Sequence, residues 1–158
     1  GAAALIVGAL APALAVKWTP TAAAVARHVA SHGVGDFASY REAVDLRYRR
    51  IGEATAFLRD DAATPGPIYV FGDPLYYLLG DREQALVRNG WGWEVALRRH
   101  WEALPRTLQA RRPAYVLVAA DARPLIEARS PETLAWLASN FEVRQSDALG
   151  TWYADRER

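Results

Sequence analysis

Helical and strand patterns of apolar residues alternate along most of the chain. Apolar positions recur on one helix face over residues 37–60, with a break expected near Gly52, and again over residues 94–111. Two short uncharged runs, Ile68–Phe71 and Ala114–Ala120, predict buried strands, because a strand covered on both faces has no polar side to expose. These segments predict a layered fold with a central sheet.

Shorter segments complete the pattern. A short helix is expected from Asp73 to Gly80, with Asp73 as its cap, and another over residues 131–140. The run Ala85–Val87 predicts a further strand, and Phe141–Gln145 with Thr151–Ala154 predicts a closing hairpin. Because strands alternate with helices, the expected fold class is α/β: a small three-layer, Rossmann-like sheet, mostly parallel with an antiparallel C-terminal hairpin.

The start of the chain follows a different pattern. Its first residues, GAAALIVGALAPALAV, carry no charge and are followed by Lys17 and Trp18. This run is shorter than the about 20 residues of a membrane span, so it fits the exit end of a truncated span with Lys17 and Trp18 at the interface. It also fits the remnant of a signal peptide, because Ala13–Ala15 resembles a cleavage site, or a buried Ala-rich helix.

The expected segments are an N-terminal apolar helix, a linker that contains a short helix over 22–31, and a soluble α/β domain: 1–18, 19–36 and 37–158.

Composition and motifs narrow the chemistry. A net charge of +1 gives no general attraction to nucleic acid, and the chain has no cysteine for a disulfide or a thiolate metal site. His28 and His32 lie four residues apart, but a zinc site needs further ligands. Gly72 is followed by Asp73 and Pro74, which does not fit a glycine-rich nucleotide turn. We therefore expect no metal and no cofactor.

Two aspartates and a tryptophan-rich segment are candidates for binding. Asp73 and Asp121 each follow a predicted strand, and ligands of doubly wound sheets lie beyond the carboxyl ends of the strands. Helix capping and turn formation explain both aspartates as well. Tryptophans stack on sugars, but they also fill cores. The candidate substrate-binding residues, none of them catalytic, are Asp73, Tyr76, Asn89, Trp91, Trp93 and Asp121.

Several segments occur in a recognisable order between about Tyr40 and Tyr153. They read YRRIGEATAFLRD, IYVFGDPLYYLLGD, RRPAYVLVAAD, SNFEV and GTWYADR. In this order, after an apolar run, they resemble the C-terminal soluble region of integral-membrane glycosyltransferases of the GT-C class. The similarity is to bacterial proteins akin to protein O-mannosyltransferases and to the lipid A aminoarabinose transferase.

The resemblance implies a parent protein that moves a sugar from a polyprenyl-phosphate donor to a lipid or protein acceptor at the outer face of the membrane. In such families the catalytic acidic residues lie in the first extracytoplasmic loop, which this sequence does not contain. The chain is then expected to be a non-catalytic extracytoplasmic domain, on the periplasmic or outer side, whose partner is the membrane-embedded part of the same polypeptide. The alternative is a free-standing periplasmic or secreted saccharide-binding α/β module.

Overall fold

The computed structural model describes residues 19, 22–31, 33, 39, 41, 45–60, 64–91 and 97–158. The chain forms two compact units, Gly1–Arg50 and Ile51–Arg158. Within these described ranges, no helix combines the length and the apolar character needed to cross a membrane.

In the first unit, residues 22–31 are helical, as predicted. His28 is buried and shares a hydrogen bond with Ser39, with 3.3 Å between Nε2 and Oγ. The apolar helix expected over 1–18 and the second histidine, His32, lie outside the described residues.

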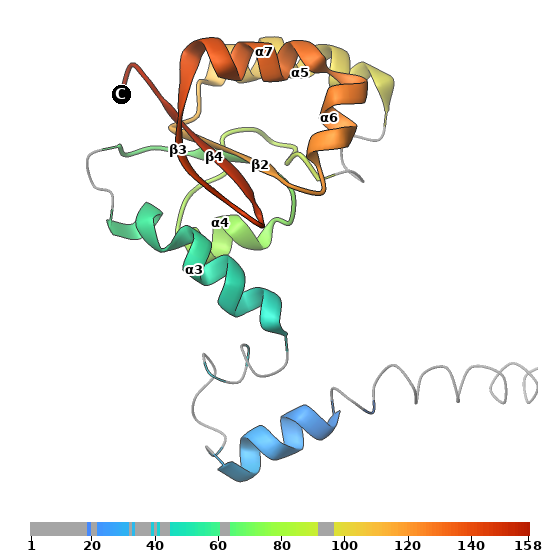
Figure 1. Cartoon of the computed structure of the whole chain (residues 1–158), viewed down its shortest axis with the longest axis vertical. Coiled ribbons are helices and arrows are strands. Elements are labelled where there is room, and N and C mark those ends of the chain that lie inside the picture. The colour runs from blue at the N-terminus through green and yellow to red at the C-terminus, as the bar shows by residue number, and fades with distance from the viewer. Residues whose placement is uncertain are drawn as a thin grey trace, which may run out of the picture. The chain divides into compact units, whose positions relative to one another are not determined.

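A four-stranded mixed sheet forms the centre of the second unit (Figure 1). Its strands are β1 (Ile68–Phe71), β2 (Tyr115–Ala119), β3 (Phe141–Asp147) and β4 (Gly150–Asp155). Their spatial order is β1-β2-β4-β3. The pair β1/β2 is parallel, whereas β4 is antiparallel to both β2 and β3.

The α/β class and the closing hairpin are therefore confirmed, but the expectation of a mostly parallel sheet is wrong. The second strand of the hairpin, not the first, lies beside β2, which turns that pairing antiparallel. Burial explains the choice: β4 buries Trp152 and Ala154, whereas β3 exposes Glu142, Val143 and Arg144. The more polar strand takes the edge, where one side of the strand remains in water.

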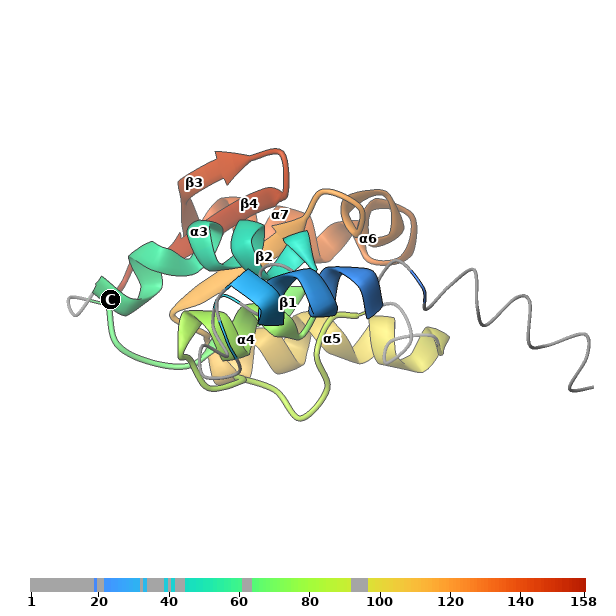
Figure 2. The same cartoon turned by 90° about the horizontal axis from the view of Figure 1, so that it is seen from below.

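Helices cover both faces of the sheet (Figures 1 and 2). One face is covered by α3 (Leu46–Asp60), from Ile51 onward, and α4 (Leu75–Gly80). The other is covered by α5 (Arg98–Arg111), α6 (Arg123–Arg129) and α7 (Pro131–Asn140). The helix α3 passes through Gly52 without the expected break, and α5 continues through Pro105.

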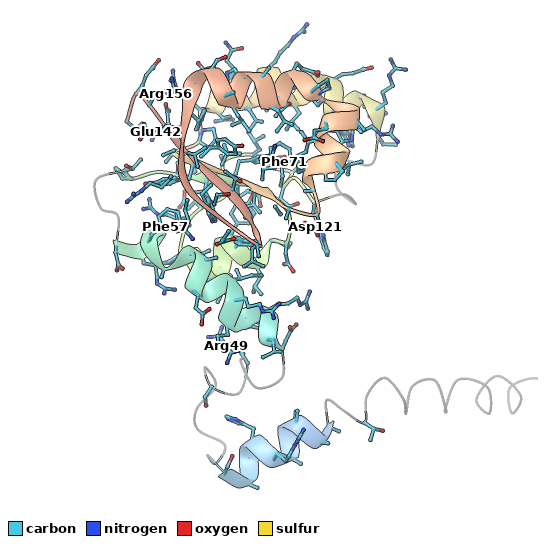
Figure 3. The ribbon with its side chains drawn as sticks, viewed as in Figure 1. Arg49, Phe57, Phe71, Asp121, Glu142 and Arg156 are labelled. Carbon is cyan, nitrogen blue, oxygen red and sulfur yellow. The ribbon has the colours of Figure 1, made fainter. Side chains whose placement is uncertain are left out.

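The alternation of side chains along β2 divides the core in two. Tyr115 and Leu117 pack with α3, where Phe57 meets the Tyr115 ring edge-on at 5.6 Å between centroids (Figure 3). Val116 and Val118 pack on the opposite side, against α5, α6 and α7. Successive side chains of a strand point to opposite faces, so one uncharged strand requires two covering layers.

The strand expected around Ala85–Val87 is not formed. Residues 83–90 instead bend along the outer edge of β1 and are held to it by three backbone hydrogen bonds. The Ile68 N–H donates to the Glu83 carbonyl at 2.9 Å, and the Ala85 N–H donates to the Ile68 carbonyl at 2.8 Å. The Gly90 N–H donates to the Val70 carbonyl at 2.8 Å. The Val87 side chain is fully exposed, so this run lacks the burial that a core strand provides.

Shortening of the Leu58 side chain on α3 tests this packing. Leu58 is fully buried, so Leu58→Ala is expected to lower the free energy of unfolding by about 2–5 kcal/mol, because a cavity remains where the side chain was. Urea denaturation followed by circular dichroism measures this loss. The matched control is Leu78→Ala on α4, where the side chain is 65% exposed and the change is expected to stay within about 0.5 kcal/mol. Equal effects of both substitutions would show that α3 does not cover the sheet.

Candidate functional site

The parallel pairing of β1 and β2 brings the ends of both strands to one edge of the sheet. Phe71 pairs with Val118, so the chain leaves β1 at Gly72 and β2 at Asp121 on the same side. Figure 3 labels Phe71 and Asp121 at this end of the sheet. Ligands of α/β sheets commonly bind at such an edge, because the connections there diverge and leave a crevice.

A small pocket of about 200 Å³ lies at this edge. Among the residues that line it are Gly72, Trp91 and Asp121, with Leu125 from α6. The Trp91 side chain is 44% exposed, although it is one of the largest apolar groups in the chain. Asp121 is exposed and, within the described part of the chain, its carboxylate forms no hydrogen bond and no ion pair.

The backbone before Trp91 holds the indole in this position. Asn89 is only 2% exposed, and its side-chain oxygen accepts a hydrogen bond from the backbone N–H of Trp91 at 2.5 Å. Gly90 donates its N–H to the Val70 carbonyl at 2.8 Å. A Cβ atom on Gly90 would lie 2.7 Å from the Phe71 Cα atom, so only glycine permits this close approach.

Two other candidates have structural roles. The Asp73 carboxylate accepts the Leu75 N–H at 2.9 Å, so it caps the start of α4, as the alternative interpretation held. Tyr76 is 4% exposed, and its ring lies 6.0 Å from that of Trp152, edge-on within the core.

Of the six candidate residues, two line the pocket (Trp91 and Asp121), one shapes it (Asn89), and Trp93 lies outside the described residues.

Negative charge accumulates at this edge of the sheet. Burial raises the pKa of Tyr76 to about 12, and the charges of Asp147, Asp121 and Asp73 add to the shift. Asp147 was not among the sequence candidates. It is the last residue of β3, and its Oδ1 accepts the N–H groups of Leu149 and Gly150 across the turn to β4. The turn was predictable from its sequence, but its position beside β2 depends on the strand order.

The three carboxylates do not form a metal site. Among the residues that the structure describes, no three His, Cys, Asp or Glu side chains are grouped so that they could hold a metal ion. The pocket therefore offers an aromatic face, a free hydrogen-bond acceptor and a negative potential. This combination suits a neutral polyhydroxylated ligand and opposes a phosphate placed at the same point.

No protein-family model matches the chain, and neither a curated protein nor a solved structure matches it.

The environment of Tyr76 predicts a loss of stability in alkali. Because its pKa is higher in the folded chain than its ordinary value of about 10, the neutral phenol favours folding. This contribution is fully present below pH of about 10 and is lost as the pH rises toward about 12.

We expect the wild-type chain to lose about 1 kcal/mol more stability than Tyr76→Phe between about pH 9 and about pH 11. Urea unfolding at both pH values measures the difference. Tyr153→Phe is the matched control, because the Tyr153 side chain is only partly buried on the opposite side of the sheet. Equal losses in the wild type and Tyr76→Phe would contradict the raised pKa.

Proposed function

We propose that the chain is a non-catalytic, saccharide-contacting domain of a membrane glycosyltransferase that uses a polyprenyl-phosphate-linked sugar. The observation that carries this proposal is the exposed Trp91 indole, which lines one pocket together with the Asp121 carboxylate, a group without a hydrogen bond or ion pair among the described residues. A pyranose ring presents an apolar face to an indole and hydroxyl donors to a carboxylate.

The size of the pocket favours an accessory role. Its volume of about 200 Å³ is below the range of about 300–1,000 Å³ that encloses a complete small-molecule ligand. It suits contact with a single sugar ring of a larger molecule. An auxiliary contact of this kind helps to orient a donor or an acceptor while the reaction takes place elsewhere.

The link to a membrane glycosyltransferase rests on the resemblance of the segments between about Tyr40 and Tyr153 to the soluble C-terminal regions of the GT-C class. Along the chain, a strand, a short helix, an arginine-rich helix, a strand, two further helices and a closing hairpin follow one another. In this proposal the domain lies on the extracytoplasmic side and acts with the membrane-embedded part of the same polypeptide. Its ligand is the sugar of the lipid-linked donor or of the lipid or protein acceptor.

A free-standing periplasmic or secreted saccharide-binding module is the second candidate. It is favoured by the position of the Trp91 pocket, because the described residues that line it all belong to the second compact unit. The coding sequence upstream of Gly1 distinguishes the two. Several hydrophobic spans with an acidic pair in the first outer loop support the transferase, and a short basic start followed by a signal peptide supports the free-standing module.

A saccharide titration tests the shared site. Tryptophan fluorescence of the wild-type chain, followed across a panel of neutral and acidic glycans, is expected to change with neutral sugars. Trp91→Ala and Asp121→Asn are each expected to weaken this binding by about tenfold, because each removes one side of the contact.

Isothermal calorimetry on the same variants gives the affinity independently of the lost indole signal. Asp60→Asn, at an exposed position of α3 outside the pocket, is the control and should leave the affinity unchanged. Binding that survives both pocket substitutions would place the saccharide elsewhere. Absence of binding to every glycan of the panel would contradict the proposal that the Trp91 pocket binds a saccharide.

A second experiment addresses catalysis. We expect the isolated chain to transfer no sugar from a polyprenyl-phosphate-linked donor to a lipid or peptide acceptor, because the proposed catalytic centre belongs to another part of the parent. A radiolabelled-donor transfer assay measures this directly. Sugar transfer by the wild-type chain alone, together with its loss in Asp121→Asn, would show that this domain is itself catalytic.

A further inference from the structure

A second and larger cavity, of about 500 Å³, lies between residues 85–88 and α5. It shares no lining residue with the Trp91 pocket, so the two are separate sites. Its volume falls within the range that holds a complete small ligand. The saccharide proposal makes no use of it.

The inner wall of this cavity is apolar. It includes Tyr69 of β1, Leu86 and Leu104, whose side chains are at most 8% exposed. An apolar group that covers this wall gains binding free energy, because apolar surface is removed from water.

The cavity is elongated along one helix. Arg99, Ala103, Thr107 and Arg111 all line it and recur every four residues on α5, so they form a single stripe along the helix. At a rise of about 1.5 Å per residue, the stripe is about 18 Å long. Small side chains occupy its middle and arginines its two ends. This shape suits an extended alkyl chain better than a compact ring.

The rim of the cavity is positively charged. Three arginines line it, Arg88, Arg99 and Arg111, all of them exposed. Within the described ranges none of the three forms an ion pair, and no aspartate or glutamate lines the cavity. Among the described residues, no carboxylate balances this charge. An arginine guanidinium offers several N–H donors in the planar arrangement that matches phosphate oxygens.

We propose that this groove binds an anionic amphiphile with a single alkyl chain, with the chain along α5 between Ala103 and Leu86 and a phosphate head at the arginines. Neither half of the site is sufficient alone. Exposed arginines hold a free phosphate weakly, because water and salt screen the charges. A neutral amphiphile leaves the arginines without a partner.

Calorimetry on the full chain tests the proposal with three probes, each below its critical micelle concentration. Decyl phosphate is expected to bind. Decyl dimethylphosphine oxide has the same chain without the charge and carries no sugar that could bind the Trp91 pocket, and inorganic phosphate has the charge without the chain, so both are expected to bind at least about tenfold more weakly. Octyl phosphate is expected to bind more weakly than decyl phosphate, because less apolar surface is buried.

Variants of α5 locate the ligand. Ala103→Phe fills the groove and is expected to weaken decyl phosphate binding by about tenfold or more, whereas Ala110→Phe, on the same helix but outside the cavity, is expected to have no effect. One of Arg99→Gln and Arg111→Gln is expected to weaken binding by about tenfold and the other to have a smaller effect, because the two arginines lie at opposite ends of the groove and the ligand has one head. The larger effect identifies the end that holds the head.

Arg106→Gln is the charge-matched control, because Arg106 is exposed on α5 and does not line the cavity. Thermal unfolding without ligand verifies that each variant is folded. Equal binding of decyl dimethylphosphine oxide and decyl phosphate, no effect of Ala103→Phe, or equal effects of Arg106→Gln and the two rim substitutions would each overturn the proposal.

Discussion

The rest of the structure depends on the burial of β2 on both faces. Its five residues, YVLVA, carry no charge and are all buried, so neither face can be left to water. Tyr115 and Leu117 require α3 and α4 on one side, and Val116 and Val118 require α5, α6 and α7 on the other. The same strand needs a hydrogen-bonding partner along each edge, and β1 and β4 supply them.

The position of the Trp91 pocket follows from this arrangement. Because β1 runs parallel to β2, the turns after both strands meet at one edge, and Trp91 reaches the same edge through the segment pinned to β1. The close approach of β4 brings Asp147 there as well. It also requires Gly150, whose φ of +154° and contact with the Val118 backbone leave no room for a Cβ atom. The negative potential of this edge is thus a product of tertiary structure.

The sequence predicted what local patterns determine. Uncharged runs located β1 and β2, and periodicity located α5 and the buried face of α3, because each signal lies within one element. The order of β3 and β4 was not predicted, although the charges of Glu142 and Arg144 favour an edge strand. Asp121 and Trp91 were identified as candidates, but the role of Asp73 as a cap and the presence of Asp147 depend on contacts that spacing does not encode.

Residues 83–91 have a consequence beyond the two proposed ligands. This segment forms a wall of both cavities, yet it is attached to β1 through main-chain atoms, and the side chain of Val87 contributes nothing to the core. Backbone hydrogen bonds do not depend on side-chain identity. Substitutions among its outward-facing positions can therefore change what the two cavities recognise while the sheet keeps its register. Change at these outward-facing positions therefore carries little risk to folding, whereas Leu86 and Gly90 of the same segment are fixed by the core and by the close approach to Phe71.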